Sequence, residues 1–88
     1  MEIIIKGHPS DRMIQRGIEY EDVENAILHG HIKRIGTENK LPIYQAVCSR
    51  FGKYVTVIFY RYQNCAYVET VRKSKRQEIS LYRKRSRR

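Results

Sequence analysis

Several features that would point to other classes of protein are missing from the sequence. The 88 residues include no tryptophan, two prolines and two cysteines. No apolar run approaches the roughly 18 residues that cross a bilayer, and the run at Ile3–Ile5 is far shorter than the roughly 7 to 15 residues of a secretory signal. We therefore expect a soluble protein of the cytoplasm.

Patterns of metal, redox or nucleotide chemistry are also missing. Cys48 and Cys65 do not belong to a CxxC pair and can make one disulfide at most, so we expect reduced, small apolar residues in strands. His29 and His31 flank Gly30 without the further ligands of a zinc site, and we interpret them as helix-end residues favoured by the dipole. Because Walker and GxGxxG segments are absent as well, we expect no metal and no cofactor.

Acidic residues become scarce at the C-terminal end of the chain. The formal net charge is +9, and residues 72–88 hold nine basic side chains against Glu78 alone, so this segment carries +8 and residues 1–71 carry +1. A run of like charge repels itself unless a counter-charge is present. The asymmetry predicts a polyanionic partner, with RNA the first choice, and a solubilising tail is the alternative.

The length allows one hydrophobic core but not two, so residues 1–88 should form a single domain with a basic C-terminal segment at 72–88. A β-prone stretch at Glu2–Gly7 precedes Pro9, which suits the first turn of a helix running to about Arg16, and Gly17 is a suitable C-cap. A second helix should end at Gly30, because apolar residues recur before it at helical spacing. These residues are Val23, Ala26 and Ile27.

Beyond the second helix, the sequence is typical of strands joined by short turns, which connect antiparallel neighbours. In the third of these strands Val55, Val57 and Phe59 share one face. The expected strands are 31–36, 43–50, 54–62 and 65–72, followed by a basic helix at 74–85. The pattern predicts an α+β fold in which two N-terminal helices pack on a curved antiparallel β-meander of about four strands, with a basic C-terminal helix.

One candidate site lies on the first helix. His8, Arg12 and Arg16 are spaced by four residues, which brings them near one side of a helix. Cleavage of RNA without a metal requires a base, an acid and a cation beside the phosphorus, and histidine and arginine can supply these roles. A cap histidine with solvent-facing arginines is the alternative interpretation.

A second set of residues could hold a nucleic-acid strand. Tyr60 and Tyr62 could stack on unpaired bases, and Arg61 between them could bind phosphate, although tyrosines are also common structural residues of strands. The basic residues predicted to grip the strand are Lys53, Arg72, Lys73, Lys75, Arg76, Arg83 and Lys84.

The segment from His8 to Val23 resembles the H-x-x-x-R-M-x-x-R-G-I-x-x-x-D-V signature of an uncharacterised domain family grouped with the BrnT-like toxins of the RelE/ParE superfamily. The ending, with Arg72–Glu78 and Leu81–Tyr82, is similar to the basic, tyrosine-containing ending of BrnT-like chains. In this family a small residue commonly follows the histidine, so Pro9 predicts that His8 lies at the helix cap.

The resemblance implies a RelE/ParE-like fold and a small ribonuclease toxin that an acidic antitoxin protein neutralises. It is compatible with a homo-oligomer of the toxin or a hetero-oligomer of toxin and antitoxin. It gives His8, Arg12 and Arg16 a place in the active site, and Tyr82 approximates the C-terminal tyrosine of RelE-like nucleases. The hypothesis is therefore a metal-independent endoribonuclease in which Arg61 assists these residues.

Two other functions stay open at the level of sequence. The chain could bind RNA or DNA without cutting it, with the basic segment providing most of the affinity. Alternatively, the basic segment could dock on a protein, either the antitoxin or a target such as DNA gyrase. Fold-level analogy does not distinguish these functions.

Overall fold

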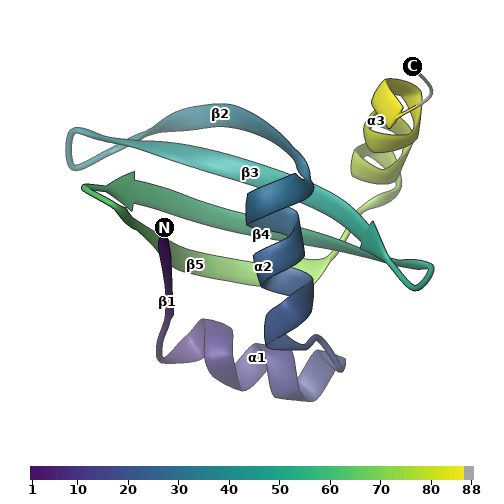
Figure 1. Cartoon of the computed structure of the whole chain (residues 1–88), viewed down its shortest axis with the longest axis horizontal. Helices are drawn as coiled ribbons and strands as arrows, with labels where there is room; N and C mark the ends of the chain where they lie inside the picture. Colours follow the sequence, from purple (N-terminus) through teal and green to yellow (C-terminus); the bar gives the residue numbers. More distant parts are fainter. Residues whose placement is uncertain (87–88) are drawn as a thin grey trace.

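Five strands form one sheet, and three helices pack around it in a computed structural model that describes residues 1–86 (Figure 1). Arg87 and Arg88, which belong to the predicted basic segment, lie outside the described residues. In chain order the elements are β1 (Glu2–Ile5), α1 (His8–Arg16), α2 (Tyr20–His29), β2 (His31–Glu38), β3 (Leu41–Arg50), β4 (Lys53–Tyr62), β5 (Cys65–Lys73) and α3 (Arg76–Ser86).

The sheet has the strand order β1-β5-β4-β3-β2. Strands β2 to β5 form the antiparallel meander that the sequence predicts, within two residues of the expected bounds. The prediction of about four strands was wrong in one respect, because β1 pairs with β5 in parallel and makes the sheet mixed. Strand β1 forms backbone hydrogen bonds with the edge of β5, and its Ile3 and Ile5 pack against the core.

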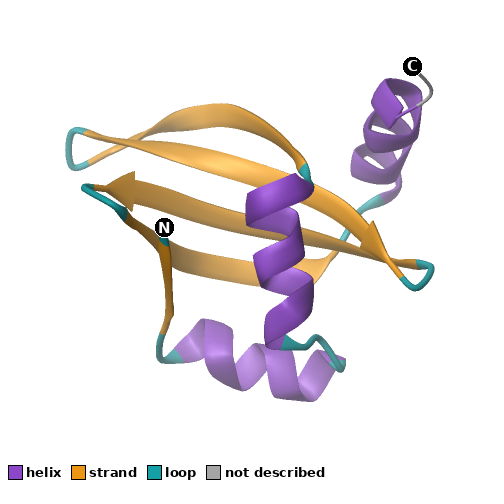
Figure 2. Ribbon diagram, viewed as in Figure 1, coloured by secondary structure: helices purple, strands orange, loops and turns teal. Residues whose placement is uncertain are grey.

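Helices α1 and α2 cover one face of the sheet (Figure 2). Gly17 ends α1 in the left-handed conformation, with φ 65° and ψ 32°, as predicted for a C-cap. Helix α1 starts at His8, just before Pro9, and has Gly7 as its N-cap. His8 is thus the first helical residue, and the prediction that it lies at the cap was wrong by one position.

The core lies between these two helices and the sheet. Val55, Val57 and Phe59 of β4 are almost completely buried in it, which confirms the predicted alternation. Helix α2 contributes Val23, Ala26 and Ile27. The opposite face of β4 carries Thr56, whose hydroxyl lies 2.7 Å from Ser74 Oγ and 2.9 Å from Glu78 Oε1. Helix α3 is therefore joined to the face of the sheet that α1 and α2 leave uncovered.

Candidate nucleic-acid interface

Helix α1 and strand β5 enclose a groove that gathers the residues of the candidate active site. His8, Arg12 and Arg16 line one wall, and Glu69, Thr70 and Arg72 line the other, around a volume of about 460 Å³. Pro9 and Met13 are buried beneath the helix, which leaves the polar side chains at its rim. The groove therefore combines a histidine, three arginines and a carboxylate.

The fold fixes the position of Arg16 within this groove. Its Nη1 donates a hydrogen bond of 2.9 Å to the carbonyl oxygen of Val71. This bond ties the last turn of α1 to β5 and uses one of the five N–H groups of the guanidinium. Arg16 can thus hold the two elements together and present positive charge to the groove.

A second hollow continues the groove toward the end of β5. It has a volume of about 510 Å³ and shares Arg16 and Arg72 with the first hollow. Lys73 and Lys75 line the rest of it together with Gln15. We use the name cationic groove for the two hollows together, with its basic residues His8, Arg12, Arg16, Arg72, Lys73 and Lys75.

Arg72 is held by the carboxylate of Glu78. Its two terminal nitrogens donate hydrogen bonds of 2.6 and 2.7 Å to the two carboxylate oxygens. Burial acts to raise the pKa of Glu78, but hydrogen bonds from Arg72, the Lys75 backbone and Thr56 outweigh it and lower the pKa to about 2. Glu78 therefore stays ionised and orients Arg72, although it offsets part of the charge.

Glu69 is a groove residue that sequence reasoning missed. It occupies the irregularity of β5, because Val68 pairs with Phe59 and Thr70 pairs with Ile58 while Glu69 has no partner in the ladder. Burial raises the pKa of the Glu69 carboxyl, and the nearby Glu38 carboxylate raises it further. Glu69 lines both this groove and a separate hollow beside Glu38, and a carboxyl with a raised pKa is a candidate for proton exchange.

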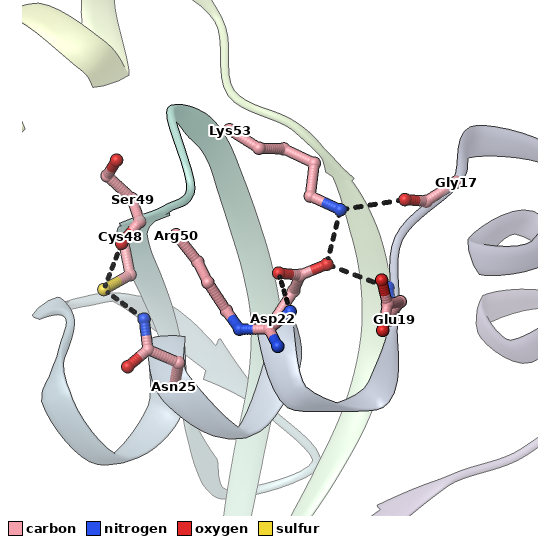
Figure 3. Close-up of polar contacts among 8 residues, drawn as sticks. All are labelled: Gly17, Glu19, Asp22, Asn25, Cys48, Ser49, Arg50 and Lys53. Carbon is pink, nitrogen blue, oxygen red and sulfur yellow. Dashed lines mark hydrogen bonds and ion pairs between the residues drawn. The ribbon is translucent and has the colours of Figure 1, made fainter.

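Lys53, which the sequence predicts to grip a nucleic acid, pairs with a buried carboxylate (Figure 3). Its ammonium group lies 2.7 Å from the buried carboxylate of Asp22 and donates to the Gly17 carbonyl. Arg50 binds the other carboxylate oxygen at 3.0 Å, and the Glu19 backbone N–H also donates to Asp22. Burial acts to raise the pKa of Asp22, but these contacts outweigh it and lower the pKa.

Two predicted catalytic residues lie outside the cationic groove. Arg61 pairs with Ala66 near the turn between β4 and β5 and is exposed. Tyr82 packs edge-on against Tyr54 of β4, with ring centroids 6.0 Å apart, and its hydroxyl lies 3.9 Å from Cys48 Sγ. The structure therefore gathers His8, Arg12 and Arg16 but does not bring Arg61 or Tyr82 to them.

The tyrosines predicted to contact bases lie on β4. Tyr60 stacks on Tyr67 of β5 with ring centroids 5.2 Å apart, so this ring has a cross-strand partner. Tyr62 is about half exposed. Neither side chain lines the cationic groove.

Helix α3 carries a second basic surface. Arg76, Arg83 and Lys84 line a hollow of about 380 Å³ together with Ile79 and Ser80. Arg83 donates a hydrogen bond of 3.0 Å to the Tyr54 hydroxyl, which fixes part of this surface to β4. The surface offers cations without a side chain that exchanges protons near neutrality.

The interpretation of both histidines near Gly30 as helix-end residues was correct for His29 and wrong for His31. His29 belongs to the last turn of α2, whereas His31 begins β2. Burial lowers the pKa of His31, and the positive charges of Arg85 and Lys33 lower it further. Among residues 1–86, no group of three or more histidine, cysteine, aspartate and glutamate side chains could hold a metal ion.

Comparison with models of known protein families and with curated proteins finds no match to this chain. Within the described part of the chain, no helix is long and apolar enough to span a membrane.

Proposed function

We propose that the chain is the toxin of a toxin–antitoxin pair and that it cleaves RNA in the cationic groove without a metal. The observation that carries this proposal is the meeting of His8, Arg12, Arg16 and Glu69 in one hollow between α1 and β5. The resemblance of the His8–Val23 segment to BrnT-like toxins supports the toxin role and a RelE/ParE-like fold. Two free thiols support a reducing compartment, the cytoplasm.

In the proposed reaction, either His8 or Glu69 takes the proton of a ribose 2′-hydroxyl. The 2′-oxygen then attacks the adjacent phosphorus, and the bond to the 5′-oxygen breaks as the other residue donates a proton to it. Arg12 and Arg16 bind the phosphate oxygens, whose negative charge increases in the transition state. The products are a 2′,3′-cyclic phosphate and a free 5′-hydroxyl.

Arg72 is the third arginine of the groove in this scheme. Glu78 holds its guanidinium with two short hydrogen bonds, so its orientation is set before RNA arrives. Lys73 and Lys75 continue the positive charge beyond it and would bind the phosphates that follow the scissile one.

Incubation of purified protein with labelled RNA in excess chelator tests the proposal. We expect fragments that end in cyclic phosphate, and His8→Ala should lower the cleavage rate by about 10²- to 10⁴-fold because it removes a proton-transfer group. Arg12→Ala should lower it by about 10²-fold or more through loss of charge stabilisation.

Matched controls lie outside the groove. His29→Ala removes an exposed histidine of α2, and Arg34→Ala removes an exposed arginine of β2, so both variants should cleave like the parent. If His8→Ala and Arg12→Ala also cleave like the parent, these residues are not the active site.

The competing function is binding without cleavage, and the surface of Arg76, Arg83 and Lys84 favours it because cations alone suffice there. Intact RNA in the chelator assay, retained on the protein at low salt, would support the binder. The antitoxin we propose is an acidic protein that covers the cationic groove. Growth arrest on expression, relieved by co-expression of a small acidic protein encoded by a neighbouring gene, tests the toxin role against a housekeeping role.

A further inference from the structure

Phe51 projects from the turn between β3 and β4. Its exposed fraction is 90%, whereas Phe59, the other phenylalanine of the chain, is 1% exposed in the core. An aromatic ring gains little from the fold when it stays in water. The packing of this domain therefore does not explain a phenylalanine at this position.

The backbone at Phe51 makes this residue still less favourable for the fold. Phe51 has φ 54° and Gly52 has φ 76°, so both central residues of the turn have positive φ. Turns of this kind favour Asn-Gly, because bulky side chains are strained at positive φ. The turn between β2 and β3 follows this preference, since Asn39 occupies its first central position with φ 49°.

Strand pairing brings the turn that carries Phe51 to the same end of the sheet as Lys73, the last residue of β5. The guanidinium carbon of Arg50 lies 4.7 Å from the Phe51 ring centroid, and Asp22 fixes Arg50 from the other side. Strand β4 starts two residues after Phe51 and runs beside the end of β5, where Val55 pairs with Lys73. The Ser74 N–H donates to the Tyr54 carbonyl, so the chain that leads from β5 to Lys75 starts beside the first residues of β4.

We propose that Phe51 stacks on an unpaired base of an RNA strand whose phosphates lie along the cationic groove. The inference rests on the RNA-binding part of the proposed function and does not require cleavage. Lys73 and Lys75 supply charge for the phosphates, and the exposed ring supplies a surface for the base. Stacking of this kind tolerates any base and is typical of proteins that hold single strands.

The test measures affinity for a short 2′-O-methylated oligouridylate by fluorescence anisotropy, since this strand lacks the attacking hydroxyl. Phe51→Asn should weaken binding by about tenfold, which corresponds to about 1.4 kcal/mol. Binding of an abasic strand of the same length should not change. The salt dependence of binding should also stay the same, because the substitution removes no charge.

Controls separate stacking from folding and from general apolar contact. Phe51→Asn should raise the melting temperature, because asparagine tolerates positive φ. Phe51→Trp should keep the parent affinity. Ile14→Asn removes another exposed apolar side chain, which lies about half a turn from Arg12 and Arg16 on α1, and should bind RNA like the parent.

The inference is overturned if Phe51→Asn binds the oligouridylate as tightly as the parent, or if the parent binds the abasic strand equally well. A protein contact would then be the remaining role for Phe51. The result is independent of the cleavage assay. If RNA stays intact and binding depends on Phe51, the nuclease function is rejected and the stacking role is kept. If RNA is cleaved and Phe51→Asn binds with the affinity of the parent, the stacking role is rejected and the nuclease function is kept.

Discussion

Replacement of Glu78 by glutamine should destabilise the protein in a pH-dependent way. The carboxylate accepts two hydrogen bonds from Arg72 and one each from Thr56 and the Lys75 backbone, so it joins the start of α3 to β4 and β5. Glutamine keeps the size of the side chain but removes its charge and one acceptor. Arg72 would lose its ionic partner.

The magnitude follows from the pKa of Glu78. The value falls from an ordinary 4.5 to about 2, and each pH unit corresponds to about 1.36 kcal/mol, so the ionised form contributes at most about 3 kcal/mol. Water reaches both partners, since the side chains of Arg72 and Glu78 are 22% and 11% exposed. Allowing for this screening, we expect Glu78→Gln to lower the free energy of unfolding by about 2 kcal/mol at pH 7.

The sign of the pH dependence is set by the lowered pKa. The stabilisation is fully present above about pH 4.5, where the carboxylate is ionised in the folded and unfolded chains alike. It is lost as the pH falls toward about 2, because the folded protein must then protonate Glu78. The difference between parent and variant should therefore shrink steadily between these two values.

Urea unfolding of the parent and the variant, followed by circular dichroism at several pH values, measures this difference. Glu2→Gln serves as control, because Glu2 is an exposed carboxylate of β1 and its loss should change stability by less than about 0.5 kcal/mol. A destabilisation by Glu78→Gln that is equally large at pH 7 and near pH 2.5 would refute the electrostatic account. So would a variant as stable as the parent at pH 7.

Two further predictions concern the carboxyl groups of Asp22 and Glu69. Asp22→Asn should lower the free energy of unfolding by about 3 kcal/mol or more in chemical denaturation, because Arg50 and Lys53 would lose the buried charge that pairs with them; a loss below about 1 kcal/mol would contradict this role. If Glu69 acts as the base, RNA cleavage should slow at acidic pH as its carboxylate becomes protonated, and the raised pKa of Glu69 places this decline above the ordinary range for glutamate. Glu69→Gln should remove the decline from the pH profile. An unchanged profile would assign the proton to His8 or to another group.

Local patterns in the sequence predicted most of the fold. The alternation of Val55, Val57 and Phe59 identified the buried face of β4, and Gly17 identified the end of α1, because both follow from contacts within a few residues. The parallel pairing of β1 with β5 was missed. A strand of four residues does not indicate which edge it joins, since that depends on which strand the finished sheet leaves unpaired.

The candidate site was predictable in part for the same reason. The spacing of His8, Arg12 and Arg16 places them on one side of a helix whatever the helix packs against. Glu69 lies at an irregularity in β5, and Lys53 pairs with Asp22 of a distant helix. Both outcomes depend on contacts between distant segments, which no local pattern in a single sequence specifies.

The tie between Arg16 and Val71 spans 55 positions of the chain. One wall of the cationic groove comes from the first helix and the other from the last strand, so a growing polypeptide has no groove until nearly all of it has been made. Loop closure over such a distance is slow compared with the formation of a helix or a hairpin. The protein should therefore gain its cationic groove at the end of folding, together with the docking of β1 on β5.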